Sequence, residues 1–442
     1  MMRENLYNEQ TKLLLDKRTL TLIFVIFASF IHGVCAQLPL SPLPITPEPV
    51  GSGARALGQS AFIAVADDAT AASWNPAGLT NLRRSEASFV GARRESKKDY
   101  SGSVLFDQDR WRDSQINFMS YAQHFDIGNK DVVISANYHQ VYNMGIEVNS
   151  SSPGLGPGLG LEYYARSKGA ISAYTLAGGL IVTPGLSAGA GFNWYTKSLH
   201  NDYAWQVKAL TTIDLGFQTT ETADLDTFDD FDGHNFTLGL LWRAYQKEDN
   251  LLTLGLVYHT PFTAKVDRDF VVNTTITEPF SPPFPLISHE TTSWSHDMKI
   301  DFPASLGAGA NYRITEKLNV AFDVEWKDWS KFKQKYPDGR SISPIDNSAL
   351  AYRLGGQYRL LYDEISQSVL ACRGGAFYEP RPIANESDLL PVYGISTGLG
   401  WTALERFSLD FAYQYRWAEQ DFGNTDYDFD EHLFLASLII YF

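Results

Sequence analysis

One stretch of the chain has the spacing of a catalytic nucleophile. Residues 394–398 read Gly-Ile-Ser-Thr-Gly, which matches the G-x-S-x-G pattern of serine hydrolases. In those enzymes the serine stands on a sharp turn between a strand and a helix, and a histidine and an acid complete the site. Here the motif lies inside an alternating strand pattern, and no partner histidine and acid are indicated. We interpret the match as coincidental, so the sequence predicts no catalytic residue and no enzyme.

Two other segments have the composition of ligand-binding loops. The acidic run DLDTFDDFDG, residues 224–233, has the acid density of a calcium loop, but its spacing does not fit the twelve-residue EF-hand. The glycine-rich run GLGPGLG, residues 154–160, does not link a strand to a helix as a phosphate-binding loop does. The histidines are scattered without metal-ligand spacing. We expect an acidic surface loop at 224–233, and neither a metal nor a cofactor.

The elements around these motifs alternate in the manner of β-strands. Residues 407–417, FSLDFAYQYRW, place apolar or aromatic side chains at every odd position and polar or small ones at every even position. Because side chains alternate across a strand, this segment has one apolar face and one polar face. The same alternation recurs in residues 186–196, 236–245, 318–326, 351–362 and 432–442.

The ends of these strands carry aromatic residues, which separates two architectures. A soluble β-sandwich has no reason to place Trp and Tyr at strand ends, whereas a membrane barrel uses them at the headgroup level. Segments of about ten residues are long enough to cross a bilayer at a tilt. The last segment reaches the terminal Phe442, as the closing strand of a barrel would. We predict an all-β fold, a transmembrane antiparallel β-barrel, with the sandwich as the alternative.

Composition and the N-terminal residues limit the cellular compartments and the partners that we expect for this protein. The 442 residues include 51 acidic and 36 basic side chains, a net charge of −15 that argues against a nucleic-acid partner. The apolar run 19–34, with small residues before Gln37, is typical of a signal peptide cleaved after Ala36. An N-terminal anchor helix and a lipoprotein processed at Cys35 are the alternatives. After residue 36, no run of eighteen apolar residues predicts a transmembrane helix.

A segment of small residues precedes the strands and should form short helices. Asp67 or Asp68 can N-cap a helix that ends before Pro76, and Asn75 can cap a second turn that starts with this proline. The predicted domains are a signal peptide (1–36), a proline-rich linker (37–50), this small-residue segment (51–82) and the barrel (83–442). Long connections are expected at 149–160, 224–233, 278–290, 335–347 and 419–431, and short turns at 315–317 and 403–405.

Several stretches, in order, resemble the FadL/TodX family of outer-membrane transporters. They are 53–79 with its Asn-Pro-Ala motif, 229–262, 303–332 with its ending DWSKF, and 352–360 followed by 373–383. The resemblance implies a barrel of about 14 strands with residues 51–82 as a small N-terminal helical hatch plugging the lumen. It also implies passive uptake of long-chain fatty acids or aromatic hydrocarbons. Such ligands would be captured at extracellular loops and leave sideways through the wall when the hatch moves.

The resemblance and the strand phase together supply candidate site residues. The motif Asn75, Pro76 and Ala77 is the candidate for gating, with simple helix capping as the alternative. Phe62 and Trp74 either contact ligand or anchor the hatch to the wall. Arg353, Arg359 and Arg416 are candidate lumen cations for a carboxylate. They are in the inward phase with Arg313 and Arg373, and pairing with neighbouring acids is the alternative for all five.

The family resemblance further implies a location and partners. We expect a monomer in the outer membrane of a Gram-negative bacterium, surrounded by lipid and lipopolysaccharide and inserted by the outer-membrane assembly machinery through Phe442. We expect a hydrophobic small-molecule ligand and no nucleic acid. Two alternatives from other classes are a structural or partner barrel for a protein-secretion or envelope complex, and an outer-membrane hydrolase.

Overall fold

The computed structural model describes most of the chain after the N-terminal region. The described ranges are 47–101, 108–128, 130–152, 160–278, 286–363, 368–382, 389–404, 406–421 and 426–442. The predicted signal peptide, most of the predicted linker and most of the run 154–160 lie outside these ranges. In the described part of the chain, no helix has both the length and the apolar character needed to span a membrane.

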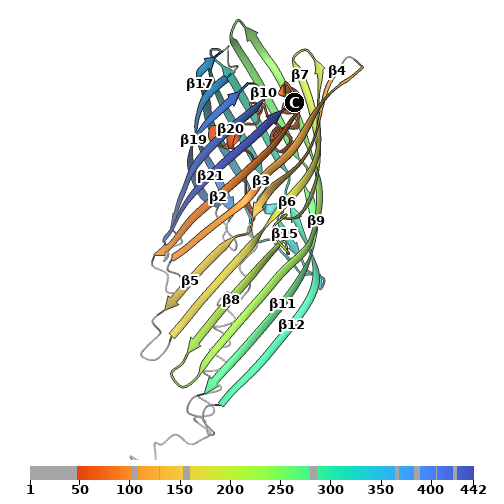
Figure 1. Ribbon diagram of the computed structural model, residues 1–442. Helices are drawn as coiled ribbons and strands as arrows, with labels where there is room; N and C mark the ends of the chain where they lie inside the picture. The colour runs from red at the N-terminus through yellow and green to blue at the C-terminus, as the bar shows by residue number, and fades with distance from the viewer. Residues whose placement is uncertain are drawn as a thin grey trace, which may run out of the picture. The chain divides into compact units, whose positions relative to one another are not determined.

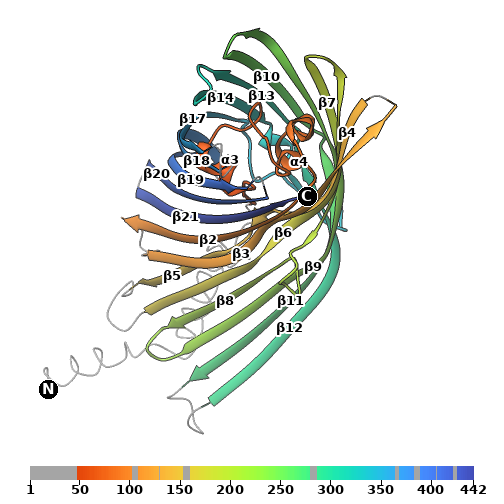
Figure 2. The ribbon, with the colours of Figure 1, turned by 45° about the horizontal axis from the view of Figure 1, so that its top comes forward.

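Fourteen antiparallel strands form a closed ring (Figure 1, Figure 2), which confirms the predicted barrel. Each strand pairs with the next one, and the last strand pairs with the first, so that the ring has no open edge at its closure. The ring strands are β2 (Glu86–Ser101), β3 (Gln108–Ile127), β4 (Lys130–Asn143), β6 (Gly160–Thr183), β7 (Leu186–Lys197), β9 (Thr219–Lys247), β10 (Asn250–His259), β13 (Ser305–Arg313), β14 (Leu318–Lys327), β17 (Ala349–Asp363), β18 (Ser368–Pro382), β19 (Leu389–Ala403), β20 (Phe407–Asp421) and β21 (Asp426–Tyr441).

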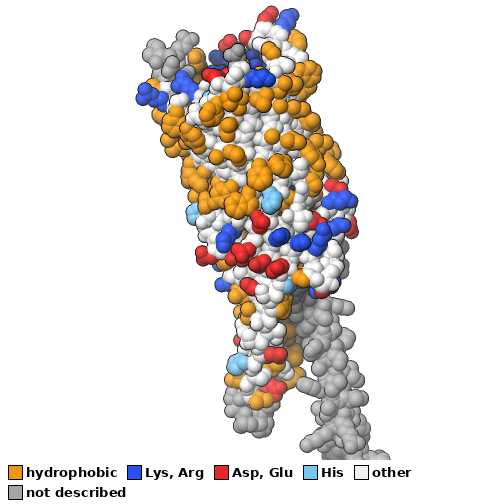
Figure 3. Space-filling model, turned by 90° about the vertical axis from the view of Figure 1, so that its right-hand side faces the viewer, with side chains coloured by type: hydrophobic (Ala, Val, Ile, Leu, Met, Phe, Trp, Pro, Cys, Tyr) orange, Lys and Arg blue, Asp and Glu red, His pale blue; other side chains and the backbone are white. Residues whose placement is uncertain are grey.

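The outer face of the ring is apolar over one band. On β9, Phe236 and Trp242 are 54% and 53% exposed, while Thr237 and Leu241 are buried on the other face. Figure 3 shows apolar side chains gathered in such a band, with charged side chains beyond it. A band of exposed aromatic and aliphatic side chains is stable only against lipid. The alternation predicted from the sequence is therefore confirmed, with its apolar face outward.

The two ends of the ring differ in the length of their connections. At the end that holds the C-terminus, strands are joined by residues 128–129, 184–185, 248–249, 314–317 and 404–406. The short turns predicted near 315–317 and 403–405 are confirmed. Outer-membrane barrels have short periplasmic turns and longer extracellular connections, so the end at the top of Figure 1 is the periplasmic end.

On the extracellular side, one half of the ring continues as a curved sheet, seen in the lower half of Figure 1. The first parts of β6 and β9 run into this extension without a break, and four other strands flank them. The added strands are β5 (Ile146–Ser152), β8 (Trp205–Asp214), β11 (Phe262–Glu278) and β12 (Leu286–Phe302), with η2 (Trp329–Lys331), β15 (Lys333–Lys335) and β16 (Ser341–Ile342) beside β12.

The prediction of an acidic loop at 224–233 is wrong. These residues belong to β9, where they pair with β8 and β11. Buried Asp226 is bound there by Arg268 of β11 through two hydrogen bonds of 2.7 and 2.8 Å. Polar strands are stable in this extension because it lies outside the lipid-facing band. For the same reason the predicted long connections 149–160, 278–290 and 419–431 are partly strand.

The ring encloses the small-residue segment 51–82, as Figure 2 shows for its two helices. The segment contains α3 (Ala54–Gln59), α4 (Ala71–Trp74) and the 3-10 helix η1 (Pro76–Asn81), and it follows β1 (Glu48–Pro49). Helix α3 lies against β19 and β20, whereas η1 lies against β6 and β7, so the segment reaches across the lumen. We call residues 51–82 the hatch segment.

The capping predicted for the hatch segment is confirmed at one of its two helices. Asn75 Oδ1 accepts a hydrogen bond of 3.2 Å from Ala77 N, and Pro76 opens η1. The preceding helix is shorter than predicted, because α4 begins only at Ala71. Asp68 instead accepts a hydrogen bond of 3.0 Å from Thr70 N just before it.

Candidate functional site

Three wall glycines receive the turn formed by Asn75, Pro76 and Ala77. Gly179 of β6, Gly189 of β7 and Gly239 of β9 are successive register partners. A Cβ atom on Gly189 would lie 2.3 Å from Ala77 N, and one on Gly239 would lie 2.1 Å from Asn75 Oδ1. No side chain fits at these distances, so the backbone of the turn lies directly on the backbone of the wall.

Glycines continue this contact around the ring. Five more lie so close to the hatch segment that a Cβ atom would meet one of its backbone atoms at 3.2 Å or less. The eight positions, which we call the glycine girdle, are Gly179, Gly189, Gly239, Gly255, Gly309, Gly355, Gly375 and Gly398. They come from eight different strands. The girdle explains why a segment of small residues can fill this lumen at backbone-to-backbone distance.

Asn75 ties the hatch segment both to itself and to the wall. Its side chain is fully buried, and its Nδ2 donates to Ile63 O at 2.9 Å and to Leu240 O of β9 at 3.2 Å. With the cap to Ala77 N, all parts of this amide are used. A buried amide with three partners is costly to replace, because each group left unpaired keeps its full desolvation penalty.

Asp323 of β14 holds the hatch segment at a second place on the wall, three strands from β9. Its buried carboxylate accepts hydrogen bonds from Phe62 N at 2.6 Å and Ile63 N at 3.0 Å. Two backbone donors aimed at one carboxylate oxygen fix the chain at this point. The sequence placed Asp323 on the polar face of a strand, but nothing in it indicated which donors the carboxylate would meet.

The two predicted ligand contacts, Phe62 and Trp74, lie against each other. Their ring centroids are 3.6 Å apart, and Phe62 is buried while Trp74 is half-buried. Trp74 Nε1 donates to Ser52 O at 2.9 Å, and the guanidinium of Arg353 lies 5.4 Å from the Phe62 centroid. The pair therefore joins the start of the hatch segment to its middle and to the wall.

A cluster of charges fixes α3. Arg55 lies 2.9 Å from Asp67, 3.8 Å from Asp68 and 3.3 Å from Asp410 of β20. Burial raises the pKa of the Asp68 carboxyl above its usual value, and the positive charge of Arg55 opposes this change. The cluster connects two parts of the hatch segment and one wall strand through a single guanidinium.

The predicted lumen cations fall into two groups. Toward the extracellular side, Arg353 is bound by Glu379 and lies 2.9 Å from Glu325, and Arg416 lies 2.9 Å from Glu431. Arg373, in the same inward phase, lies 2.8 Å from Asp410. These three arginines already have acid partners. Arg359 and Arg313 lie apart from them, at the periplasmic ends of β17 and β13. There they line a cavity on the periplasmic side of the hatch segment.

The wall is interrupted between β3 and β4. Their ladder runs only from Phe118 and His139 to the periplasmic turn, and on the extracellular side the described pairing resumes with the single pair Gln108 and Asn149. Between these points, residues 109–116 of β3 pair with β2 and Asn117 forms a bulge, and none of them has a ladder partner on the other edge among the described residues. Most strand edges in a barrel are paired, so an interruption of this length is a gap in the hydrogen-bonded wall.

Residues 48–53 lie in this gap. We call them the N-terminal segment, and their last three residues are also the first three of the hatch segment. Glu48 and Pro49 pair with Asn143 and Tyr142 at the end of β4, and Val50 N donates to Val141 O at 2.8 Å. On the opposite edge, the buried side chain of Asn117 donates to Gly51 O at 2.7 Å and accepts from Gly53 N at 3.0 Å. The N-terminal segment thus joins β4 to β3 where these strands do not meet.

Charged and aromatic side chains complete the closure of the gap. The Glu48 carboxylate lies 2.8 Å from Arg94 and 3.6 Å from Lys98, both on β2. Trp111 of β3 is buried against Gly145, where a Cβ atom would lie 2.5 Å from its ring. The gap is therefore filled by a peptide segment and side chains rather than by a continuous ladder.

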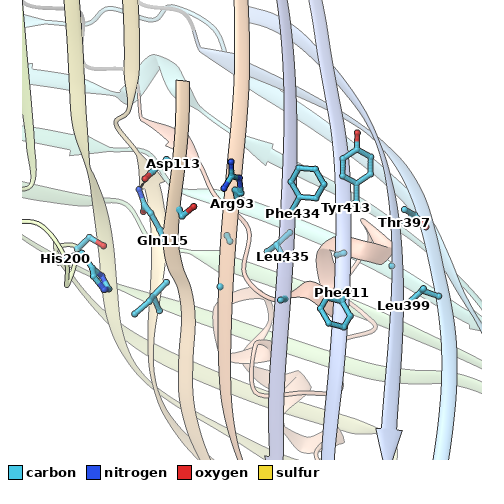
Figure 4. A pocket seen from close by; sticks show the side chains of 18 of the residues that line it. Arg93, Asp113, Gln115, His200, Thr397, Leu399, Phe411, Tyr413, Phe434 and Leu435 are labelled. Atoms are coloured by element: carbon cyan, nitrogen blue, oxygen red, sulfur yellow. Dashed lines mark hydrogen bonds between the residues drawn. The ribbon is translucent and has the colours of Figure 1, made fainter. Parts of the chain in front are cut away.

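A groove of about 810 Å³ starts beside this gap on the barrel wall. It is lined from β3 across β2, β21 and β20 to β19, and among its lining residues Phe411 and Phe434 are exposed on the outer face. Figure 4 shows Tyr413 and Phe434 on neighbouring strands, with Gln115 farther toward His200. An apolar molecule that passed the gap would enter this lipid-facing groove.

Stacked aromatic rings occupy the lumen on the extracellular side of the hatch segment. Phe262 and Tyr195 stack at 4.3 Å, and Phe262 and Phe302 stack at 4.7 Å. Phe302 also stacks on Tyr142, whose hydroxyl accepts a hydrogen bond of 3.2 Å from Lys327 Nζ. These residues come from β4, β7, β11, β12 and β14, so aromatic surface connects distant parts of the wall.

Comparison with known proteins assigns this architecture to a family. The family model described as outer membrane protein transport protein (OMPP1/FadL/TodX) matches residues 48–431. No curated protein sequence matches the chain.

Three solved structures share the fold. A FadL homologue from Pseudomonas aeruginosa is 13% identical with a TM-score of 0.60, covering 91% of this chain and 100% of its own. The toluene transporter TbuX from Ralstonia pickettii is 13% identical with a TM-score of 0.55, covering 89% and 98%. The toluene transporter TodX from Pseudomonas putida is 12% identical with a TM-score of 0.56, covering 90% and 100%. The matched span, together with the closed barrel, shows that this chain belongs to the OMPP1/FadL/TodX family of outer-membrane transport proteins of Gram-negative bacteria.

Proposed function

We propose that the protein is a passive channel for uncharged hydrophobic small molecules, with aromatic hydrocarbons as the leading class. Ligands are captured at the extracellular extension and loops and pass the stacked aromatic rings. They leave sideways through the gap between β3 and β4 when the N-terminal segment withdraws. The hatch segment keeps the direct route to the periplasm closed. The protein catalyses no reaction in this scheme.

The gap and its occupant carry the proposal. The N-terminal segment fills an interruption in the wall, and it continues directly into the hatch segment, so movement of one pulls on the other. Lateral release suits an apolar cargo, because each methylene moved from water into lipid contributes about 0.8 kcal/mol. A molecule released into the periplasm would have to give up that energy.

The charge pattern of the lumen favours an uncharged ligand over a fatty acid. A carboxylate held in the lumen would need a buried cation as its partner. Arg353, Arg373 and Arg416 already bind acids, so none of the three is free for this role. Aromatic rings, by contrast, offer offset and edge contacts to another aromatic ring. The toluene transporters with the same fold are consistent with this choice. The sequence alone left both ligand classes open.

A disulfide lock tests the lateral route. Val50 and Val141 are hydrogen-bonded neighbours on antiparallel strands, where paired Cα atoms lie about 5.5 Å apart and accept a disulfide. We expect Val50→Cys with Val141→Cys, in a Cys372→Ala background, to stop uptake of radiolabelled toluene by cells that express the protein. Reduction should restore it. The matched control is a disulfide between β10 and β13 at Leu256→Cys and Ala308→Cys, which are register partners away from both the gap and the groove.

Two results would count against the proposal. Uptake that continues with the lock closed would show that the gap is not the exit. Uptake of laurate but not toluene by the unmodified protein would reverse the proposed ligand class. If neither compound is taken up, the partner-barrel function becomes the better explanation.

A further inference from the structure

A second cavity lies on the periplasmic side of the hatch segment. Its volume is about 190 Å³, and it is lined on one side by hatch residues and on the other by the periplasmic ends of wall strands. The wall strands are β7, β9, β10, β13, β14 and β17, which are neighbours in the ring. A water molecule takes up about 30 Å³ in the liquid, so the cavity has room for a small organic ion.

The wall of this cavity carries three arginines on three strands. They are Arg243 of β9, Arg313 of β13 and Arg359 of β17. Arg313 Nε donates to the backbone carbonyl of Asp249 at 2.9 Å. Among the described residues, no carboxylate lies within ion-pair distance of any of the three guanidinium groups. This distinguishes them from Arg353, Arg373 and Arg416, each of which has an acid partner.

The acids that line the cavity are already in use. Asp67 and Asp68 both lie against Arg55, which also contacts Asp410. The cavity therefore holds three arginines whose positive charge is not balanced locally. Guanidinium groups that line one concave site favour an oxyanion, because they offer only donors and stay charged at all accessible pH values.

The hatch segment contributes one more donor. Gln59 is 3% exposed, and its Nε2 has no hydrogen-bond partner in the described part of the chain. Its side chain lines the cavity, while its backbone lies against Gly355 and Gly375 of the wall. A buried amide donor without a partner is unfavourable, and an acceptor in the cavity would satisfy it.

We propose that this cavity binds the carboxylate group of a small organic acid that enters from the periplasm. The carboxylate accepts hydrogen bonds from the wall arginines and from Gln59, so that it bridges the wall and the hatch segment. A bound acid thereby stabilises the seated hatch, since it binds the seated state and not the displaced one. The site is separate from the uptake route, and it stands whether or not the protein carries aromatic hydrocarbons.

The test is a ligand titration on the full-length protein in detergent micelles. Acetate, succinate and inorganic phosphate are added at constant ionic strength, with chloride as the reference, and the thermal unfolding midpoint is recorded. We expect a saturable rise with acetate or succinate and no rise with chloride. The replacements Arg313→Gln and Arg359→Gln should each weaken the apparent affinity roughly tenfold, the size expected for one charged hydrogen bond. The double variant should show no saturable rise.

The control variant is Arg340→Gln. Arg340 is an exposed arginine that lies beside Asp338. It belongs to the extracellular connection between β15 and β16 and does not line the cavity. It should respond to the acids as the unmodified protein does. A response of the double variant equal to that of Arg340→Gln would overturn the site.

The same titration decides whether the cavity binds a carboxylate or a phosphate. A saturable response to phosphate with none to acetate or succinate would overturn the carboxylate assignment. Toluene uptake by the arginine variants separates this inference from the proposed function. Unchanged uptake with lost acid binding supports two independent sites, whereas a loss of uptake in Arg359→Gln that matches the disulfide lock would contradict their independence.

Discussion

The two ends of the enclosed chain are held in opposite ways. The Asn75–Ala77 turn lies on wall glycines at distances that leave no room for a side chain, and its asparagine uses every donor and acceptor. The N-terminal segment, residues 48–53, lies between two strand edges and is held by a few backbone bonds, one asparagine and the ion pairs of Glu48 with Arg94 and Lys98. The first arrangement resists displacement, while the second can be undone bond by bond.

This difference leads us to change the gating role that the sequence prediction gave to Asn75, Pro76 and Ala77. We propose that the Asn75-Pro76-Ala77 motif is the fixed anchor of the hatch segment and that the N-terminal segment is its moving part. Trp74 connects the two, because its ring contacts Phe62 and its indole N–H holds Ser52 O. Disturbing the anchor should therefore unseat the whole hatch, and disturbing the N-terminal segment should change only the opening of the gap.

The largest effect is expected from a side chain under the anchor. Gly189→Val places a Cβ atom 2.3 Å from Ala77 N, so the turn cannot seat without a backbone shift. We expect a loss of more than about 4 kcal/mol in the free energy that holds the hatch segment. Planar-bilayer recordings should show an open, conducting barrel. Gly91→Val is the control, because a Cβ atom there meets nothing within 4 Å. Closed channels in the Gly189 variant would show that the turn is not a fixed anchor.

A smaller effect is expected from the anchor's own side chain. Asn75→Ala removes three hydrogen bonds and leaves Ile63 O and Leu240 O without this donor. The cost should be about 2–3 kcal/mol. Hydrogen exchange of peptides covering residues 71–82 measures it. Asn81→Ala, which loses one bond to Ala66 O, should cost about a third as much. Equal costs for the two variants would remove the special role of Asn75.

Weakening the contacts of the N-terminal segment should have a smaller effect, and this effect should appear in the N-terminal segment itself rather than at the anchor. Asn117→Ala removes the two bonds that hold Gly51 and Gly53, at a cost of about 1–2 kcal/mol. Exchange should rise in a peptide covering residues 48–53 and stay unchanged at 71–82, and toluene uptake should become faster. A rise of the same size in both peptides would mean that anchor and moving part are one unit.

The smallest effect is expected at the ion pair of the gap. Glu48→Gln keeps an acceptor for Arg94, which also lies 3.4 Å from Glu431, so about 0.5 kcal/mol is lost. The change should appear as faster uptake that no longer depends on salt between low and physiological ionic strength. A salt dependence equal to that of the unmodified protein would show that Glu48 does not hold the segment.

Local patterns explain how far the sequence could predict this structure. The strand at 407–417 was predictable because its alternation is a property of consecutive residues. The strand at 224–233 was not, because its acids are compatible with a strand only through Arg268 on β11 and through its place outside the lipid. Both segments are strands, but only the second depends on a distant partner, Arg268, to stabilise its acids.

The contacts of the candidate site were likewise predictable only where they join residues close together in the sequence. The cap from Asn75 to Ala77 N is local, and the sequence predicted it. The contacts of Asn75 with Leu240 O, and of Asp323 with Phe62 N, join residues far apart in the chain and required the fold. The gap was also beyond the sequence, since it is an interruption in the register between two strands whose own residues continue to alternate.

The glycine girdle has a consequence for the order of folding. The hatch segment precedes β2 in the chain, and β2 is also the strand on which β21 closes the ring. A wall of eight bare backbone positions has no side chains with which to fill its own lumen, so a ring that closed first would enclose a water-filled bore. A hatch already in place would instead be a template that sets the spacing of the strands as they arrive. Closure of the last strand and burial of the hatch segment are then a single cooperative step, and variants that unseat the hatch should also assemble more slowly.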